Sequence, residues 1–268
     1  MNTQIKASFK KEILAFTRTK RFLILACVFI GWAALSPLLI KGLDVLAEGI
    51  YNEQFMSEIA GITANASTGV MSAVQDLSGI GILVFLLLIN SFAGGEQKKR
   101  SIMIPQSSGL SAFSYLFPKF IIYPLAIFIF SVAGTLVAGA VSAYIFENND
   151  IVISNLIISG ALLGVYLMLY VCLHLSLGTA TGKAGMSSAV CIAASMLLPN
   201  FFALVDAQMY NPFTLHIRAL EIASGEAMSV DVILTVVVTK VIMVLVFFVA
   251  LFAHNAKRID NSGNEILV

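Results

Sequence analysis

The chain has 268 residues, of which 59% are hydrophobic and 12% are charged, and its mean hydropathy is +0.93. The core of a soluble domain of this length needs far fewer apolar residues, so the composition excludes a soluble globular protein and predicts an all-α, polytopic membrane protein. The formal net charge of +1 conceals a segregation of basic and acidic residues along the chain.

Residues 1–21 are predicted to form an amphipathic helix at the membrane interface. Their apolar side chains recur every three or four residues, which is the period of one helix face. These residues are Ile5, Phe9, Ile13 and Phe16. Lys10 and its basic neighbours lie off this stripe, as in helices that lie along a membrane surface. The helix either serves only as a topological anchor or also contacts a cytoplasmic partner.

Six predominantly apolar runs are each long enough to cross a hydrocarbon layer about 30 Å thick. They cover residues 22–40, 77–94, 120–146, 156–178, 186–204 and 232–252. Basic residues precede the first run, as in a signal peptide, but no A-x-A cleavage pattern follows it, so we expect an uncleaved first span. A single transmembrane domain, residues 1–268, follows from this pattern.

The charges around these runs alternate from one side of the membrane to the other. Basic residues gather in the N-terminal segment, the second and fourth connections and the C-terminal tail: Lys6, Lys10, Lys11, Arg18, Lys20, Arg21, Lys98, Lys99, Arg100, Lys119, Lys183, Lys257 and Arg258. The opposite side keeps Lys41 and Arg218 with the acids Asp44, Glu48, Glu53, Glu58, Asp76, Glu147, Asp150, Asp206, Glu221, Glu226 and Asp231. The positive-inside rule places the basic side in the cytoplasm, so we expect both termini inside. We also expect the membrane to be the plasma membrane of a bacterial cell.

The connection 95–119 is predicted to contain a short amphipathic helix on the cytoplasmic side. Pro105 and Pro118 bracket it, and the Ser111 hydroxyl can cap it by accepting a hydrogen bond from a free backbone N–H. Its apolar side chains include Phe113, Leu116 and Phe117. Such a face needs lipid or a protein groove to cover it. The alternative is an ordinary interfacial loop.

Three polar residues within the runs are candidates for a transport pathway. Lys240 lies about 13 Å into the last run, where a cation is costly unless it is paired or reaches the interface along its own stem. Asn90 and His174 are further candidate members of the pathway. The three cysteines, Cys27, Cys172 and Cys191, lie inside runs without C-x-x-C spacing, so we predict neither disulfides nor a metal site.

The chain carries no recognisable motor or catalytic motif. Gly182-Lys183 is the nearest approach to a phosphate-binding loop, but Leu177 replaces the first glycine and Ala184 replaces the hydroxyl residue. The longest cytoplasmic segment, 95–119, is too short for a folded domain. We therefore expect that the chain is not itself an enzyme, has no cofactor of its own and depends on another chain for any ATP-driven work.

This layout resembles the permease subunit of type-2 ABC exporters. The shared features are the amphipathic N-terminal helix, Glu96 just after the second span, Pro105, Lys119 opening the third span, and Asn211-Pro212 before the last span. The chain departs from the family pattern in having Arg100-Ser101 where Gly-Thr is common.

The resemblance implies a pair of permeases, either a homodimer or two close paralogues, above two ATP-binding subunits that bind ATP and Mg. It places the docking surface for those subunits on the cytoplasmic helices, with Glu96, Ser108, Leu110, Phe113, Leu116, Phe117, Phe9 and Lys10. It also implies that residues 206–231 form a short re-entrant hairpin, whereas an ordinary exposed loop is the alternative.

The resulting hypothesis is an exporter permease that moves an amphipathic or hydrophobic substrate, such as a peptide, an antimicrobial or a lipid. Its partners are the ATP-binding subunits, a second permease and membrane lipid, with no nucleic acid. One alternative is a secondary transporter or channel with Lys240 in its pathway. Another is a membrane enzyme or sensor subunit, for which the sequence offers no catalytic constellation.

Overall fold

A computed structural model describes residues 2–50, 65–92, 109–146, 151–204 and 210–264. All regular secondary structure in these ranges is helical. Six helical stretches are long and apolar enough to cross a membrane: Arg21–Leu43, Ala66–Asn90, Ala112–Ile145, Ile153–Thr181, Ala184–Phe202 and Val230–Ala256. The predicted all-α class and the six candidate spans are confirmed for the described part of the chain.

Several of these stretches are built from more than one helical element. The elements are α1 (Asn2–Arg18), α2 (Arg21–Ala26), η1 (Cys27–Gly31), α3 (Trp32–Ile50), α5 (Ala66–Asp76), η2 (Leu77–Gly81), α6 (Ile82–Asn90), α9 (Ala112–Ile145), α10 (Ile153–Thr181), α11 (Ala184–Leu204), η4 (Pro212–Thr214), α12 (Leu215–Ala223) and α13 (Val230–Asn264). The first two spans each contain a π-helical segment, η1 and η2, and these contact one another.

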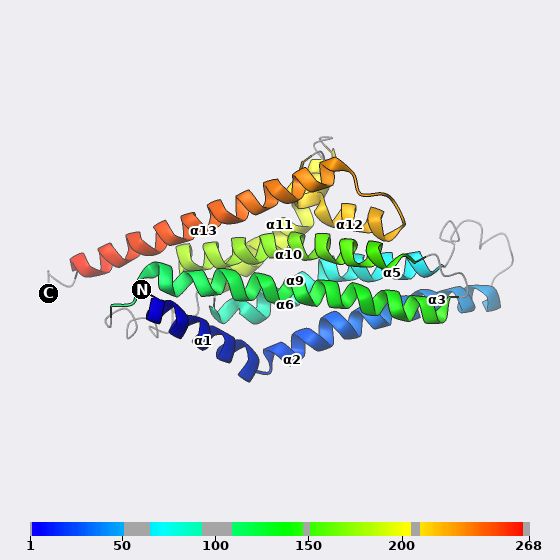
Figure 1. The fold of residues 1–268 in the computed structure, drawn as a ribbon, viewed down its shortest axis with the longest axis horizontal. Coiled ribbons are helices and arrows are strands. Elements are labelled where there is room, and N and C mark those ends of the chain that lie inside the picture. The colour runs from blue at the N-terminus through cyan, green and yellow to red at the C-terminus, as the bar shows by residue number, and fades with distance from the viewer. Residues whose placement is uncertain (1, 51–64, 93–108, 147–150, 205–209, 265–268) are drawn as a thin grey trace.

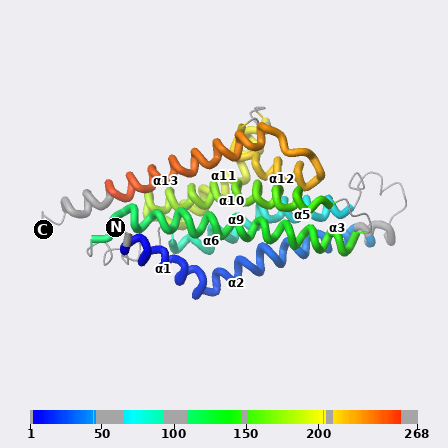
Figure 2. The backbone as a smooth tube through the Cα atoms, viewed as in Figure 1, coloured from blue at the N-terminus to red at the C-terminus, as the bar shows by residue number. Residues whose placement is uncertain are grey.

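The long helices lie side by side, and the described ends of the chain share one end of the bundle (Figure 1). We call this the terminal end and the opposite one the distal end. The backbone turns sharply between α1 and α2, so α1 leaves the line of the first span and lies beside α9 (Figure 2). An even number of spans between the two termini produces this arrangement.

Helix α10 forms the centre of the bundle and contacts α9, α11, α12 and α13. In its most apolar window 72% of the residues are buried, against 22% in α11 and in α13. Gly160 and Gly164 allow its backbone to approach α9, because an added Cβ would clash with Thr135 and Phe128 respectively. This small-residue spacing is a common way for membrane helices to pack closely.

The second span begins at Ala66, not at the predicted residue 77. Asn65 starts it with a capping box, in which its side chain accepts from the Thr68 N–H at 2.8 Å and the Thr68 hydroxyl accepts from the Asn65 N–H at 3.0 Å. Asp76, predicted in an outer connection, therefore lies within the span, where its carboxylate accepts a 2.7 Å hydrogen bond from Ser36.

The third span also begins earlier than predicted, at Ala112 instead of residue 120. The predicted cap is confirmed, since the Ser111 hydroxyl accepts from the Ser114 N–H at 3.1 Å. Residues 112–118 are the first turns of α9 and not a separate helix. Pro118 removes one backbone hydrogen bond without ending α9, because helices packed on either side keep the chain helical. Residues 93–108 lie outside the described ranges.

The chain after α11 folds back along α10 through η4 and α12. The Ser159 hydroxyl donates to the Ala219 carbonyl at 2.7 Å, and the ring of Phe213 lies 6.1 Å from that of Tyr170. Tyr170 is about 25 Å along α10 from its distal start at Ile153, at the usual helical rise. The η4 turn therefore reaches the middle of the bundle, and α12 runs back from there.

Candidate functional site

Helix α1 packs on α9 through a face that differs from the predicted stripe. Phe16 and Glu12 are buried, at 5% and 1% exposure, whereas Ile13 is 47% exposed. Ile5 and Phe9 are half-buried. The contact face therefore follows positions 5, 9, 12 and 16, so it includes three residues of the predicted apolar stripe together with Glu12, while Ile13 stays on the surface. The helix rotates this way because Glu12 has a charged partner on α9.

That partner is Lys119, which lies eight residues inside the third span and is only 1% exposed. Its ammonium lies 3.8 Å from Glu12 Oε1 and donates to the Phe92 carbonyl and the Tyr115 hydroxyl, each at 3.0 Å. The Tyr123 hydroxyl donates to Glu12 Oε2 at 2.7 Å. Buried charges are tolerated when paired and hydrogen-bonded in this way. The cluster joins α1, α9 and the end of the second span.

Aromatic rings enclose this cluster of Glu12, Lys119, Tyr115 and Tyr123, which we call the buried charge cluster. The ring of Tyr123 stacks on Phe92 at 5.0 Å and meets Phe16 edge to face at 5.9 Å. On the other side, Tyr115 stacks on His254 of α13 at 5.4 Å. The terminal end of the last span is thereby connected to the same cluster.

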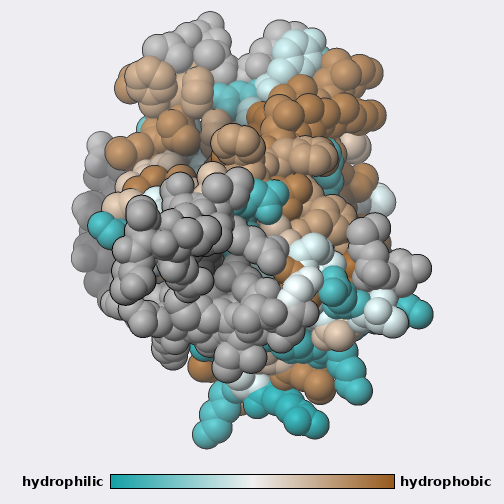
Figure 3. Space-filling view, turned by 90° about the vertical axis from the view of Figure 1, so that its left-hand side faces the viewer, coloured by the Kyte–Doolittle hydropathy of each residue, from teal (hydrophilic) through white to brown (hydrophobic). Residues whose placement is uncertain are grey.

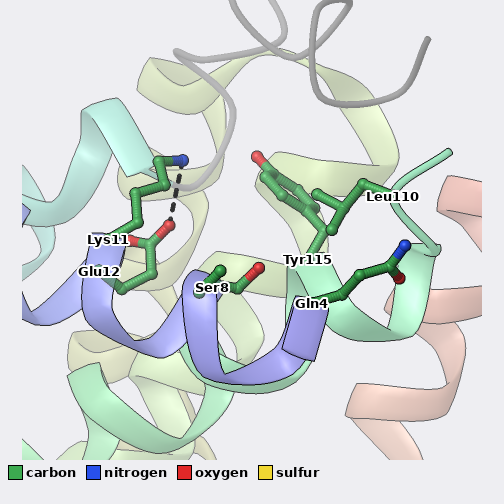
Figure 4. Close-up of a pocket in the computed structure, with 7 residues that line it drawn as sticks. Gln4, Ser8, Lys11, Glu12, Leu110 and Tyr115 are labelled. Carbon is green, nitrogen blue, oxygen red and sulfur yellow. Dashed lines mark ion pairs between the residues drawn. The ribbon is translucent and has the colours of Figure 1, made fainter. Parts of the chain in front are cut away.

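A groove of about 320 Å³ opens beside the cluster, between α1 and the start of α9 (Figure 4). It is lined by Gln4, Ala7, Ser8, Lys11, Glu12, Leu110 and Tyr115. Lys11 sits at its edge with its ammonium 3.3 Å from Glu12 Oε1. The Gln4 amide donates to the Gly109 carbonyl at 3.3 Å, which ties the first turn of α1 to the residues preceding α9.

The predicted docking residues have different positions relative to this groove. Leu110 lines it and Lys10 is exposed. Leu116 is fully buried with Tyr115 and Ala250, so it has no surface to offer a partner. The rings of Phe113 and Phe117 lie 5.9 and 6.3 Å from Phe247 of α13, and Phe9 lies 6.0 Å from Phe117. Glu96 and Ser108 are outside the described residues.

Helix α13 and helix α1 thus provide the cover that the apolar residues at the start of α9 were expected to take from lipid or a partner. The covered side chains are those at positions 113, 116 and 117, as described above. Among the described residues at this end, the accessible surface therefore belongs to the outer sides of α1 and the groove, and less to the start of α9 itself.

The three predicted pathway residues have separate neighbours. Lys240 is exposed and donates to Met168 Sδ at 3.6 Å. His174 is fully buried, with Nδ1 2.9 Å from the Ser187 hydroxyl and Nε2 without a hydrogen-bond partner. Asn90 is the last residue of α6, and its buried Oδ1 also lacks a partner. The structure does not bring these residues into one site.

Among the described residues, no three His, Cys, Asp or Glu side chains lie close enough together to hold an ion. Met168 faces Lys240, while His174 faces Ser187.

Sequence analysis overlooked Glu12, Tyr115 and Tyr123. Glu12 is the only acid in the first 21 residues of a strongly basic segment, which was a usable signal. The two tyrosines gave no such signal, because their roles depend on α1 folding back onto α9. Asp76 was misplaced by the same error that shortened the second span.

The fold defines the chain as an all-helical membrane protein with six candidate spans. No protein-family model matches the sequence, and a search of curated proteins also finds no match.

Proposed function

We propose that the chain is the membrane-spanning permease subunit of an ATP-driven exporter. Two copies, or this chain and a close paralogue, would pair in the plasma membrane above two separate subunits that bind ATP and Mg. The chain would supply the translocation path and no catalytic residue of its own. Its substrate would be amphipathic or hydrophobic, as expected for a peptide, an antimicrobial or a lipid.

The observation that supports this proposal best is the attachment of α1 to the third span. A motor in another chain acts only through rigid elements that it can touch. Helix α1 has an exposed side and is fixed to α9 by the 3.8 Å Glu12–Lys119 pair, and Lys119 also bonds the end of the second span at 3.0 Å. Force applied to α1 would therefore reach two spans together, without passing through a flexible loop.

In this proposal the terminal end faces the cytoplasm of a bacterial cell, because basic residues dominate its segments. The groove beside α1 would receive part of the ATP-binding subunit. Residues 210–223 would form a re-entrant hairpin from the outer side, since irregular backbone at that depth is acceptable where protein covers it. The packing of η4 and α12 against α10 is consistent with such cover.

Purification of the tagged protein in mild detergent, with an ATPase assay and identification of co-purifying proteins, tests the proposal. We expect a stoichiometric subunit with a nucleotide-binding motif. A Ser8→Trp substitution fills the groove and should release that subunit, and Glu96→Ala should weaken its binding. Lys6→Trp is the matched control, because Lys6 is exposed on α1 and does not line the groove.

The proposal would be overturned if no ATPase subunit co-purified with the wild-type protein expressed at its native level. A secondary transporter or channel with Lys240 in its pathway would then be favoured, because a cation within an apolar span is typical of such proteins. Retention of the subunit by Ser8→Trp would keep the exporter assignment and reject the groove as the docking site.

A further inference from the structure

Lys240 lies near the middle of the last span. The span Val230–Ala256 has 27 residues, so its centre is at residue 243, only about 5 Å from Lys240 at helical rise. Its neighbour Met168 is one residue from the middle of α10, which has 29 residues. The nearer end of the span, Val230, is about 15 Å from Lys240 at helical rise, farther than the four-carbon lysine stem extends, so snorkelling alone does not bring this charge out of the apolar span.

The protein itself supplies little compensation for the ammonium. Its contact with Met168 Sδ, at 3.6 Å, is with a weak acceptor. No carboxylate in the described part of the chain forms an ion pair with Lys240. An uncompensated cation at this depth is unfavourable, so a partner of opposite charge from outside the chain would bind with a gain in free energy.

The surroundings of Lys240 indicate the rest of that partner. An open groove of about 380 Å³ runs along α13, and apart from Lys240 its lining is aliphatic: Val236, Val237, Val241, Val244 and Leu245. Val237, Val241, Val244 and Leu245 are each more than half exposed. A small hydrated anion gains nothing from such walls, whereas a hydrocarbon chain does. The groove opens away from the bundle, on the side where acyl chains would lie in a membrane.

We propose that this groove binds an amphiphile with an anionic headgroup, with the headgroup on the Lys240 ammonium and the hydrocarbon chain along α13. The carboxylate or phosphate would pair with the ammonium, for which the described residues supply no counter-ion, and the aliphatic groove would hold the tail. The inference deepens the proposed exporter function by naming its substrate class, and it rests on that function only in calling the ligand a substrate.

Binding to the purified protein, without nucleotide or any other subunit, tests this directly. The probes are a fluorescent long-chain fatty acid and its methyl ester, at a pH where the acid is ionised. We expect the acid to bind at least tenfold more tightly than the ester, since a hydrogen bond to a charged group contributes that much. Lys240→Met should remove the preference, Lys240→Arg should retain it, and Val238→Met, on α13 but not lining the groove, should change neither probe.

A second variant separates the tail from the headgroup. Val244→Phe fills the groove and should weaken acid and ester alike. Equal affinity of the wild type for both probes, or an acid preference that survives in Lys240→Met, overturns the inference. If Lys240→Met does not fold, Val244→Phe and Lys240→Arg still decide it, because loss of the preference in Lys240→Arg or unchanged binding in Val244→Phe contradicts the proposed site.

Another outcome concerns a second copy of the chain. If Val241→Cys forms a spontaneous disulfide-linked dimer in native membranes, another copy covers the groove and the amphiphile site is rejected. Failure of acid binding while an ATPase subunit still co-purifies would reject this inference and leave the proposed function standing. Acid binding without a co-purifying ATPase subunit would support this inference and reject the proposed exporter function.

Discussion

At the residue scale, Glu12 and Lys119 stabilise each other in a place from which water is excluded. Each is 1% exposed, and removal of Lys119 takes from the buried Glu12 carboxylate its buried cationic partner, leaving Lys11 at 3.3 Å, whose side chain is 52% exposed. We expect Lys119→Met to lower the free energy of unfolding by about 3–5 kcal/mol, as for other broken buried pairs. Thermal unfolding in detergent measures this, and the double variant with Glu12→Leu should lose less than the sum of the single losses.

Lys11 is the matched control for this prediction. Its ammonium also lies near Glu12, at 3.3 Å, but its side chain is 52% exposed. Solvent screens such a pair, so Lys11→Met should cost no more than about 1 kcal/mol. Equal unfolding temperatures for Lys11→Met and Lys119→Met would show that the buried pair contributes nothing beyond a surface contact.

His216, on α12, gives the protein a predicted sensitivity to acid. Burial lowers its pKa from the usual 6.5, and its ring packs on Tyr166 at 4.8 Å. The unfolded chain therefore takes up a proton at a higher pH than the folded protein. The contribution of neutral His216 to the free energy of unfolding is fully present above about pH 6.5. It decreases as the pH falls towards the lowered pKa of His216 in the folded protein. The wild type should lose more thermal stability on acidification than His216→Phe, and parallel pH curves would contradict this.

At the element scale, the early start of the second span makes a prediction about accessibility. If the span begins at Ala66, residue 72 lies in the membrane, whereas a start at residue 77 leaves it in water. In a variant with the cysteines at 27, 172 and 191 replaced, Ser72→Cys should resist a membrane-impermeant maleimide. Ser224→Cys, exposed between α12 and α13, should react readily and serves as the control.

Rapid labelling of Ser72→Cys from either side of the membrane would show that the second span begins near residue 77.

The error in the predicted start of the second span has a clear physical origin. Ser67, Thr68, Ser72 and Gln75 lower the hydropathy of this segment, but helical packing places Ser67 in the interior, and Thr68 completes the cap. Hydropathy measures how a residue partitions into lipid and does not measure how well its neighbours satisfy it.

The same distinction explains which elements were predictable. Long apolar runs locate the spans because length and hydropathy alone decide them. The position of Ser111 as a cap was also predictable, since capping is local in sequence. The buried charge cluster was not, because the Tyr123–Glu12 hydrogen bond joins residues 111 positions apart. No local pattern indicates which face of α1 meets which turn of α9.

At the scale of the whole molecule, packing is strongly uneven. Helix α10 is enclosed, whereas α11 and α13 are largely exposed along their apolar windows. Viewed from the terminal end, hydrophobic side chains cover the upper part of the molecule, on the side of α11 and α13, and hydrophilic ones gather at the lower edge, on the side of α1 (Figure 3). Lipid or a second copy of the chain would cover the apolar side in a membrane.

The orientation of this uneven bundle decides whether the exporter proposal is physically sensible, because ATP-binding subunits exist only in the cytoplasm. Gly182 and Gly225 are turn residues with positive φ, of 68° and 103°, and they follow α10 and α12 respectively. We expect alkaline phosphatase, which is active only outside the cytoplasm, to be inactive when fused after Gly182 and active when fused after Gly225. A fluorescent protein fused to the C-terminus, which fluoresces in the cytoplasm, is the independent control. The reverse pattern at both glycines would place α1, its groove and the buried charge cluster outside the cell. No ATP-driven subunit could reach them there, so the proposed function would have to be abandoned. Binding of an anionic ligand at Lys240 would not change that conclusion.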